Sequence, residues 1–216
     1  MNILVLGSAP GTKLPNIKFD YVLFNNGSIA MEKEINFDYK IHLLSNQIFT
    51  RKNKGCEQVL SIMSNKFVDE LVLFKAKNKV KFEKDLIDIN YNYKKLKVYG
   101  RLKRCFLTLS VLNQRKLFSE IFSNLGFTKI LIEILRFLRT GNFRPIKVST
   151  GLLAVAFILR DRRFDGATIY LRGISFSDDG SHFYDLNYPY KSGHGLADKL
   201  FLFTLKNKHR NQIVIG

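Results

Sequence analysis

The sequence predicts an α/β fold, a Rossmann-like and mostly parallel sheet flanked by helices, with a short lid segment. Short, continuous apolar runs such as Ile3–Leu6 recur along the chain, which is typical of strands buried on both faces. The first three runs each end in a small polar loop, as parallel strands do at the edge where ligands collect. Longer segments between and after them have helical spacing. Length and composition suit one domain over residues 1–216, with the lid at about 178–193.

Four apolar runs in the first half of the chain predict strands, and one stretch predicts a helix. The predicted strands are Ile3–Leu6, Tyr21–Phe24, Tyr39–Leu44 and Leu71–Phe74. A helix is expected around Gln58–Asn65, before the fourth strand. Residues 75–102 are rich in Lys and Asn, and they form the least regular part of the predicted fold.

The second half of the chain is mainly helical. Residues 106–137 have helical spacing, and Gly126 is expected to break the helix. The remaining predicted elements are a buried helix at Leu152–Leu159, a strand at Ile169–Phe176, a helix at Leu196–Leu205 and a strand at Gln212–Ile215. A Ser-Thr-Gly segment precedes the first of these helices, and a His between two glycines precedes the second. That order suits a phosphate-binding α/β enzyme with one catalytic base.

The outstanding bulk property is a formal net charge of +17, from 35 Lys and Arg against 18 Asp and Glu. Such a charge favours polyanionic partners: nucleic acid, an anionic membrane surface or a phosphorylated glycolipid. The alternative is a solvated basic surface that keeps the protein soluble. The two cysteines, Cys56 and Cys105, have no CxxC spacing, so neither a disulfide framework nor a zinc cluster is expected.

The apolar segments of the sequence are too short or too interrupted to span a membrane. The run at the amino terminus lacks a basic flank and is too short for a signal peptide. Residues 127–143 are interrupted by charges at Lys129, Glu133, Arg136 and Arg139. We therefore expect a cytoplasmic protein, with the inner face of the cytoplasmic membrane as a candidate peripheral location.

The turn after the first predicted strand, GSAPG, contains small residues where backbone passes close to a ligand. Gly7, Ser8 and Ala9 are therefore candidate ligand contacts. The spacing is not GxGxxG, so a dinucleotide site is not indicated. An ordinary turn between a strand and a helix is the alternative interpretation.

Other polar residues lie at predicted helix starts and strand ends. Ser149, Thr150 and Gly151 directly precede LLAVAFILR, where exposed amides and the helix dipole favour an anion; a plain N-cap is the alternative. Asn26 and Asn46 follow two strands, where an amide can bond a sugar or base as donor and acceptor. Turn formation explains these two equally well.

His194 lies in the sequence SGHG, where the two glycines let the chain bend sharply and present the imidazole. A histidine there is a candidate general base for a hydroxyl, and an exposed loop histidine is the alternative. Asp198, one turn further, either orients the ring or favours the helix start. The remaining histidines lack this context and are interpreted as bystanders: His42, His182 and His209.

Asp178 and Asp179 are adjacent carboxylates, a pattern that suits magnesium. Because they follow a predicted strand and precede Gly180, a turn is the preferred interpretation. No metal and no cofactor are expected.

Taken together, these motifs resemble glycosyltransferase family 42, the bacterial CMP-sialic-acid-dependent sialyltransferases. GSAPG is similar to that family's Gly-Asn-Gly-Pro-Ser turn, and KVSTGLLAVAFIL to its Arg-Ile-Thr-Ser-Gly helix start. FNNG places Asn26 at its Cys-Asn-Gln asparagine, and LLSNQ places Asn46 at its Thr-Pro-Asn asparagine. IYLRGISFSDDGS is similar to its Ile-Tyr-Leu-Ser-Gly-Ile-Asp-Phe strand. SGHG matches its Ile-Gly-His-Ser catalytic histidine, here His194.

The sequence departs from the family pattern in the lid. Family members carry two tyrosines that hold the leaving phosphate, and here the first position is Ser177. The second falls near Phe183 or Tyr184, and Tyr188 or Tyr190 could also substitute. The lid between Gly180 and His194 is shorter than in the family. The donor is therefore sialic acid or another CMP-activated acid sugar such as Kdo.

The resemblance implies an inverting glycosyltransferase that moves the acid sugar from CMP to a hydroxyl of a bacterial glycan or glycolipid, as in lipooligosaccharide biosynthesis. His194 would act as the base, without a metal. The implied nucleotide- and donor-binding residues are Gly7, Ser8, Ala9, Asn26, Asn46, Ser149, Thr150, Gly151 and Tyr184. Nucleic acid is not an expected partner. The alternatives are an inactive sialyltransferase homologue and a basic nucleic-acid-binding protein, for which Tyr91–Lys97 offers a fragment of aromatic and basic residues.

Overall fold

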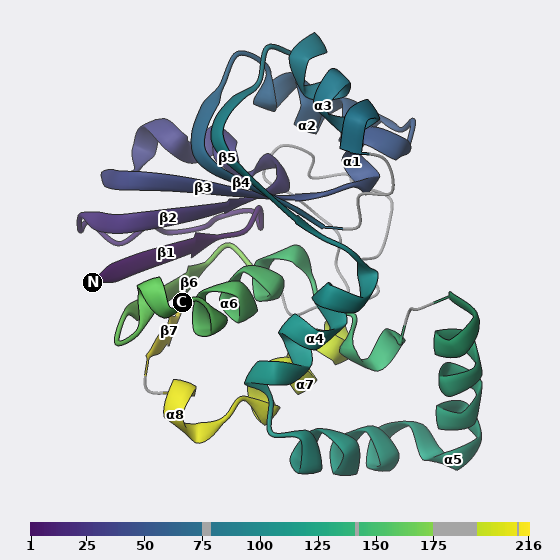
Figure 1. Cartoon of the computed structure of the whole chain (residues 1–216). Helices are drawn as coiled ribbons and strands as arrows, with labels where there is room; N and C mark the ends of the chain where they lie inside the picture. The colour runs from purple at the N-terminus through teal and green to yellow at the C-terminus, as the bar shows by residue number, and fades with distance from the viewer. Residues whose placement is uncertain (75–78, 141–142, 175–193, 211) are drawn as a thin grey trace.

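The frame of the molecule is a seven-stranded parallel sheet with strand order β5-β4-β3-β2-β1-β6-β7 (Figure 1). The computed structural model describes residues 1–74, 79–140, 143–174, 194–210 and 212–216. The strands are β1 Asn2–Leu6, β2 Phe19–Asn25, β3 Phe37–Ser45, β4 Phe67–Phe74, β5 Asn92–Tyr99, β6 Thr168–Arg172 and β7 Ile213–Ile215. The predicted α/β class with a Rossmann-like sheet is confirmed. The predicted lid lies outside the described residues.

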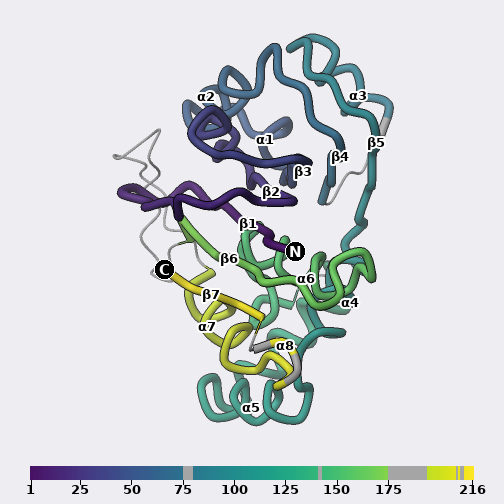
Figure 2. Tube along the Cα trace, turned by 90° about the vertical axis from the view of Figure 1, so that its left-hand side faces the viewer, coloured from purple at the N-terminus to yellow at the C-terminus, as the bar shows by residue number. Residues whose placement is uncertain are grey.

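Helices cover both faces of the sheet (Figures 1 and 2). One face packs against the 3₁₀ helix η1 and against α1, α2 and α3, and the other against α4, α6, α7 and part of α5. Their bounds are η1 Asn26–Glu34, α1 Gln47–Thr50, α2 Lys54–Met63, α3 Lys79–Asp88, α4 Arg101–Val111, α5 Gln114–Thr140, η2 Arg144–Ile146, α6 Thr150–Arg160, η3 Arg162–Phe164, α7 Gly195–Thr204 and α8 Asn207–Arg210.

The centre of the sheet follows the apolar runs of the sequence. β1 pairs with β2 on one side and with β6 on the other, and its residues Ile3–Leu6 are fully buried. α6 packs across β1, β2 and β3. Residues 151–158 of α6 are all buried, because this helix is apolar on every side and has the sheet beneath it. The start of α6 therefore lies at the carboxyl edge of the central strands.

The described part of the segment, residues 79–102, is more regular than the sequence indicates, because it includes α3 and β5. β5 is the edge strand beyond β4, and Lys94 and Lys95 on it are exposed. An edge strand needs few apolar side chains, and lysines there discourage pairing with another chain. The expectation of an irregular segment was therefore wrong at β5.

Two predicted boundaries change in the structure. Gly126 has φ 70° and ψ 163°, which divides α5 into two arms and confirms the expected break. The predicted strand Ile169–Phe176 ends earlier, since β6 stops at Arg172 and Gly173 turns the chain with φ 64°. In Figures 1 and 2, α5 extends away from the sheet, beyond α4 and α7.

Candidate functional site

The candidate site is the carboxyl edge of the sheet at β1 and β6. From β1 the chain adds β2 to β5 outward on one side and then returns to place β6 on the other. The two strand exits diverge at such a reversal, and open α/β sheets bind ligands in the crevice formed there. The exits of β1 and β6 remain in contact for a short distance, because Gly7 N donates to the Arg172 carbonyl and Ala9 N to the Gly173 carbonyl, both at 2.9 Å.

Gly7 is required by this contact between the two strand exits. A Cβ atom at Gly7 would lie 2.1 Å from the Gly173 carbonyl oxygen, a distance that backbone atoms do not tolerate. Gly7 is itself buried, whereas Ser8 and Ala9 are half-buried. Packing therefore explains the glycine. A ligand contact at Gly7, Ser8 or Ala9 stays a prediction.

Hydrogen bonds from Asn25 and Ser28 join the carboxyl end of β2 to that of β1. Neither residue was among the candidates selected from the sequence. Asn25 Nδ2 and Ser28 Oγ donate to the Leu6 carbonyl at 2.9 and 2.8 Å, and Asn25 N donates to Ser28 Oγ at 2.7 Å. All three bonds are buried, so they fix the start of η1 against the last residue of β1. The only available sequence signal was the polar pair Asn25-Asn26 after an apolar run.

Asn26 connects three segments at the carboxyl edge. Its Oδ1 accepts from Ser45 N at 3.1 Å at the end of β3, and its Nδ2 lies 3.5 Å from Thr150 Oγ1 at the start of α6. Its φ of 51° is in the left-handed region, which Asn tolerates better than most residues. The structure therefore brings together two of the residues that sequence reasoning selected, Asn26 and Thr150.

His42 has a structural role in holding Asn26 in place, and its interpretation as a bystander to the chemistry stays a prediction. The His42 side chain is fully buried in β3, and its Nε2 donates to the Asn26 carbonyl at 2.6 Å. Since a carbonyl only accepts, Nδ1 is the acceptor in the neutral ring, and the Tyr91 hydroxyl donates to it at 2.6 Å. Burial lowers the pKa of His42 to about 4, so the ring is neutral at pH 7.

Asn46 lies at the same edge, at the N-cap position of α1, where its backbone N donates to the Phe74 carbonyl at 3.1 Å. It follows Ser45, the residue that bonds Asn26. Asn46 and Asn26 therefore occupy adjacent strand exits, as the sequence predicts for parallel strands. Contact of Asn46 with a ligand stays a prediction.

The start of α6 is tied to the start of α7. Ser149 is the N-cap of α6, and its Oγ accepts from Leu152 N at 3.4 Å. Its backbone N donates to Asp198 Oδ1 at 2.8 Å, and Asp198 is buried. Asp198 thus joins the two helix starts through Ser149. Gly151, in the first turn, is buried against Ile174, whose Cδ1 would lie 2.4 Å from a Cβ atom at this position.

His194 is half-buried at the N-cap position of α7. Its Nδ1 lies 2.7 Å from the Lys147 carbonyl, which can only accept, so Nδ1 carries the proton of the neutral ring. Nε2 then carries the lone pair that a general base needs. The contact also places His194 beside the segment that leads into Ser149 and Thr150.

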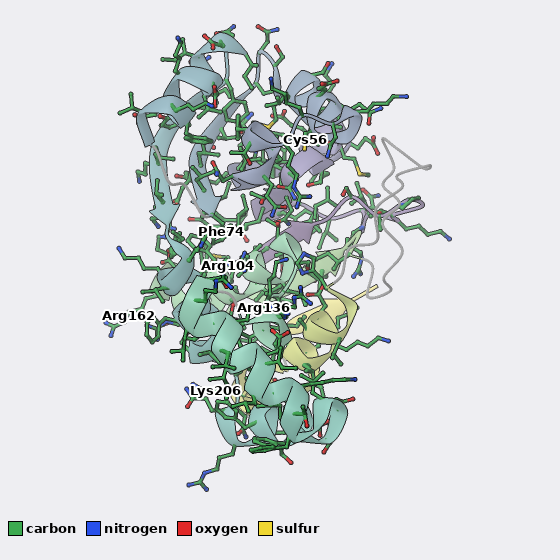
Figure 3. The ribbon with its side chains drawn as sticks, turned by 90° about the vertical axis from the view of Figure 1, so that its right-hand side faces the viewer. Cys56, Phe74, Arg104, Arg136, Arg162 and Lys206 are labelled. Atoms are coloured by element: carbon green, nitrogen blue, oxygen red, sulfur yellow. The ribbon has the colours of Figure 1, made fainter. Side chains whose placement is uncertain are left out.

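Four cations surround this segment: Arg51, Arg104, Arg144 and Lys147. Burial is the first cause that lowers the pKa of Lys147, and repulsion from the other three lowers it further. Within the described ranges, none of the four forms an ion pair with a carboxylate. In Figure 3, Arg104 lies between the sheet and the helical part that contains α5. Cations beside a helix start favour an anionic ligand.

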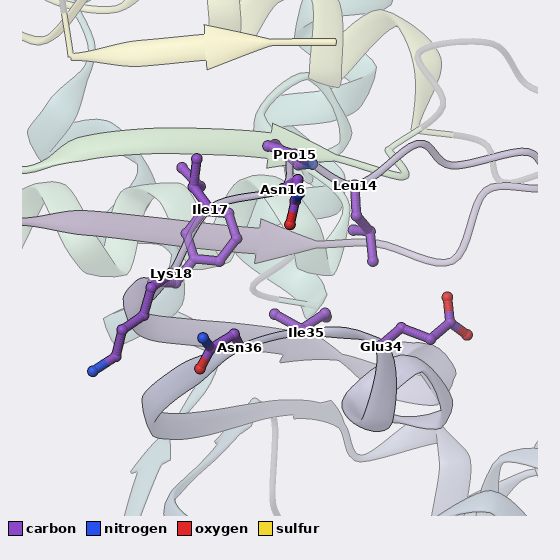
Figure 4. Close-up of a pocket in the computed structure, with 9 residues that line it drawn as sticks. Leu14, Pro15, Asn16, Ile17, Lys18, Glu34, Ile35 and Asn36 are labelled. Atoms are coloured by element: carbon purple, nitrogen blue, oxygen red, sulfur yellow. The ribbon is translucent and has the colours of Figure 1, made fainter.

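A separate pocket of about 330 Å³ lies at the opposite edge of the sheet (Figure 4). It is lined by the residues that lead into β2 and β3: Leu14–Phe19 and Glu34–Asn36. Lys18, its cation, is paired with the exposed Asp38 at 2.7 Å. None of the predicted site residues lines this pocket.

The segment that most resembles a nucleic-acid-binding fragment is used structurally. Tyr91 is buried against His42 and is not an exposed stacking platform. Lys94 pairs with Asp69 and Lys97 with the buried Glu70, each at 2.8 Å. These contacts hold β5 to β4. They engage two of the three lysines in Tyr91–Lys97.

Some predicted residues lie outside the described residues: Tyr184, the lid at about 178–193, and the pair Asp178-Asp179. In the part of the chain that is described, His, Cys, Asp and Glu side chains form no group of three or more that would hold a metal ion.

Comparison of the chain with models of protein families, with curated proteins and with solved structures gives no match in any of the three. Function is therefore inferred from the arrangement of the chain's own residues and from the motifs that they form.

Proposed function

We propose that the chain is an inverting glycosyltransferase that transfers an acid sugar from a CMP-sugar donor to a hydroxyl of a glycan or glycolipid. The observation that carries the proposal is that Thr150 lies beside Asn26 while His194 contacts the segment that leads into Thr150. Thr150 starts α6 beside Asn26, and His194 bonds the Lys147 carbonyl three residues earlier. The motif resemblance to glycosyltransferase family 42 selects CMP-activated sialic acid or Kdo as donor classes.

The proposed reaction is a direct displacement. The acceptor oxygen attacks the anomeric carbon and forms the new glycosidic bond, while the bond from that carbon to the phosphate oxygen breaks and CMP leaves. Nε2 of His194 takes the proton of the acceptor hydroxyl. Holding the acceptor and the donor together in one site would remove much of the entropic barrier, and the base would accept the proton.

The start of α6 and the four cations would stabilise the charge that develops on the leaving phosphate. Amide N–H groups of the first helical turn and the helix dipole favour an anion at this position. A phosphate there would also relieve the repulsion among Arg51, Arg104, Arg144 and Lys147, which adds to the effect of burial in lowering the pKa of Lys147. These groups supply the charge stabilisation that a divalent metal supplies in other transferases.

The described part of the structure contains no helix with the length and hydropathy of a membrane span. We place the proposed activity in the cytoplasm, at the inner face of the cytoplasmic membrane. Glycolipid acceptors are presented there, and anionic lipid headgroups attract a chain with a net charge of +17.

The Thr150 hydroxyl tests the nucleotide site. We expect Thr150→Val to weaken CMP binding by roughly 10- to 150-fold, the worth of one charge-assisted hydrogen bond of about 1.5–3 kcal/mol. Isothermal titration calorimetry with CMP measures the dissociation constant, and urea unfolding checks that the variant folds. The bond between Asn26 and Thr150 is long, at 3.5 Å, so its loss should cost little stability.

Thr150→Ser is the matched control, because it keeps the hydroxyl at the start of α6. Its dissociation constant for CMP should stay within roughly 3-fold of the wild-type value. Equal CMP affinity in wild type and a folded Thr150→Val variant would remove Thr150 from the site and return it to a structural role at the helix start.

A further inference from the structure

The two arms of α5 expose an unusual number of large apolar side chains. Typical surface helices place such residues toward the core, and isolated exposed ones need no explanation. Here eight of them lie between Gln114 and Thr140, at 44–75% exposure. We call this set the α5 surface: Phe118, Phe122, Phe127, Leu131, Ile132, Ile134, Leu135 and Leu138.

The exposed apolar residues of the second arm form one side of the helix. Phe127, Leu131, Leu135 and Leu138 are separated by four, four and three residues, which brings them onto the same side. That side is distinct from the one facing the protein, where Ile130 and Glu133 are buried. The arm therefore has two apolar sides, and only one of them is covered by the fold.

Positive charge accompanies the α5 surface. Residues 101–140, which span α4 and α5, contain eight Lys and Arg but only two Asp and Glu. One of the two acids, Glu133, is buried and paired with Arg136. On the second arm Arg139 borders the exposed apolar side, whereas Lys129 and Arg136 lie on the opposite side of the helix. A helix with an apolar side and basic residues on its polar side is the pattern of helices that lie in the interface of an anionic bilayer.

The arrangement of α5 leaves this surface accessible. In Figure 1 the first arm runs across the bottom of the molecule and the second rises along its right-hand side, so both lie at the periphery, where a flat partner can reach them. Gly126 makes this shape possible, since its φ of 70° turns the chain between the arms in a region that other residues rarely adopt.

We infer that the α5 surface is a membrane-binding element that inserts its apolar side chains into the interface of an anionic lipid bilayer. Charge favours lipid over a second copy of this chain: two copies would bring together two chains of net charge +17, whereas anionic headgroups neutralise the basic residues. An exposed apolar set of this size marks an interaction surface. The inference stands on α5 alone and does not depend on the proposed CMP-sugar chemistry.

Vesicle sedimentation with the full chain tests the inference. We expect strong partitioning to vesicles of phosphatidylcholine and phosphatidylglycerol, weak partitioning to phosphatidylcholine alone, and weaker binding at high salt because screening reduces the attraction. The triple variant Leu131→Gln/Leu135→Gln/Leu138→Gln should lower the partition coefficient at least about 10-fold. These side chains are 48%, 59% and 75% exposed, so the variant should fold.

The matched control replaces exposed apolar residues elsewhere. Val80→Gln/Ile87→Gln changes two residues of α3, 77% and 75% exposed, on the opposite face of the sheet, and should bind vesicles like wild type. All variants should bind CMP equally, which separates this inference from the proposed function. Equal vesicle binding by wild type and the α5 triple variant would overturn the inference. It would also be overturned by a wild-type dimer that ignores anionic vesicles and becomes monomeric in the triple variant.

Discussion

Replacing His194 with alanine is expected to lower transfer of the acid sugar by about 10²–10⁴-fold, the usual worth of a positioned general base. CMP affinity should be nearly unchanged, because the proposed role of the imidazole is at the acceptor hydroxyl. The reaction is followed by CMP release from CMP-sialic acid or CMP-Kdo in the presence of a lipooligosaccharide acceptor. The wild-type rate should fall in acid as the ring gains a proton, and the residual rate of the variant should lack that step.

His194→Asn is the control that separates chemistry from structure. In the wild type, Nδ1 bonds the Lys147 carbonyl at 2.7 Å, and alanine loses this bond at a cost of about 1 kcal/mol in stability. The Asn amide can donate to the same carbonyl but cannot accept a proton at neutral pH. We expect Asn to restore the melting temperature of the wild type without restoring transfer. Transfer at close to the wild-type rate by either variant would remove His194 from the mechanism.

Acid is expected to remove about 3 kcal/mol from the free energy of unfolding between about pH 6.5 and 4, through His42. Burial holds the pKa of this ring at about 4 in the folded state, below its ordinary value of 6.5. The unfolded chain therefore binds a proton in this window while the folded chain does not. The stabilisation is fully present above pH 6.5 and is lost as the pH falls toward 4. Urea unfolding at several pH values measures it.

His42→Gln identifies the group responsible. Glutamine does not titrate, and its amide can donate to the Asn26 carbonyl and accept from the Tyr91 hydroxyl. The paired carboxylates with lowered pKa values, Glu32, Asp69 and Asp161, hold their stabilisation until the pH falls below their ordinary values of 4.5, 3.8 and 3.8. A change in the free energy of unfolding between pH 6.5 and 4.5 therefore comes from histidine. A variant with the wild-type slope between pH 6.5 and 4.5 would show that another group is responsible.

The elements of the sheet centre could be predicted because a strand buried on both faces must be apolar throughout. Ile3–Leu6 satisfies this condition, and so does the all-apolar helix that covers it. β5 could not be predicted in the same way. An edge strand is paired on one side only, and Lys94 and Lys97 are held by carboxylates on β4 that lie 25 and 27 residues earlier in the sequence.

The candidate site was accessible from the sequence only where a polar residue follows an apolar run. Asn26 and Thr150 have this signature, whereas His42 lies inside a strand and gains its role from Tyr91, which is 49 residues away. The cations around Lys147 come from three further segments, α4, η2 and the residue after α1. Their proximity depends on how the helices pack, and no local pattern encodes it.

Calorimetric titration of the full chain with CMP tests whether a nucleotide binds at the start of α6. The experiment is run in EDTA and again with added magnesium, beside titrations with UMP, GDP and a short oligonucleotide. We predict saturable CMP binding at one site, unchanged by EDTA, weakened in Thr150→Val and tighter than binding of the other nucleotides. Oligonucleotide binding with a steep salt dependence and no CMP binding would contradict it, as would CMP binding that strictly requires the metal.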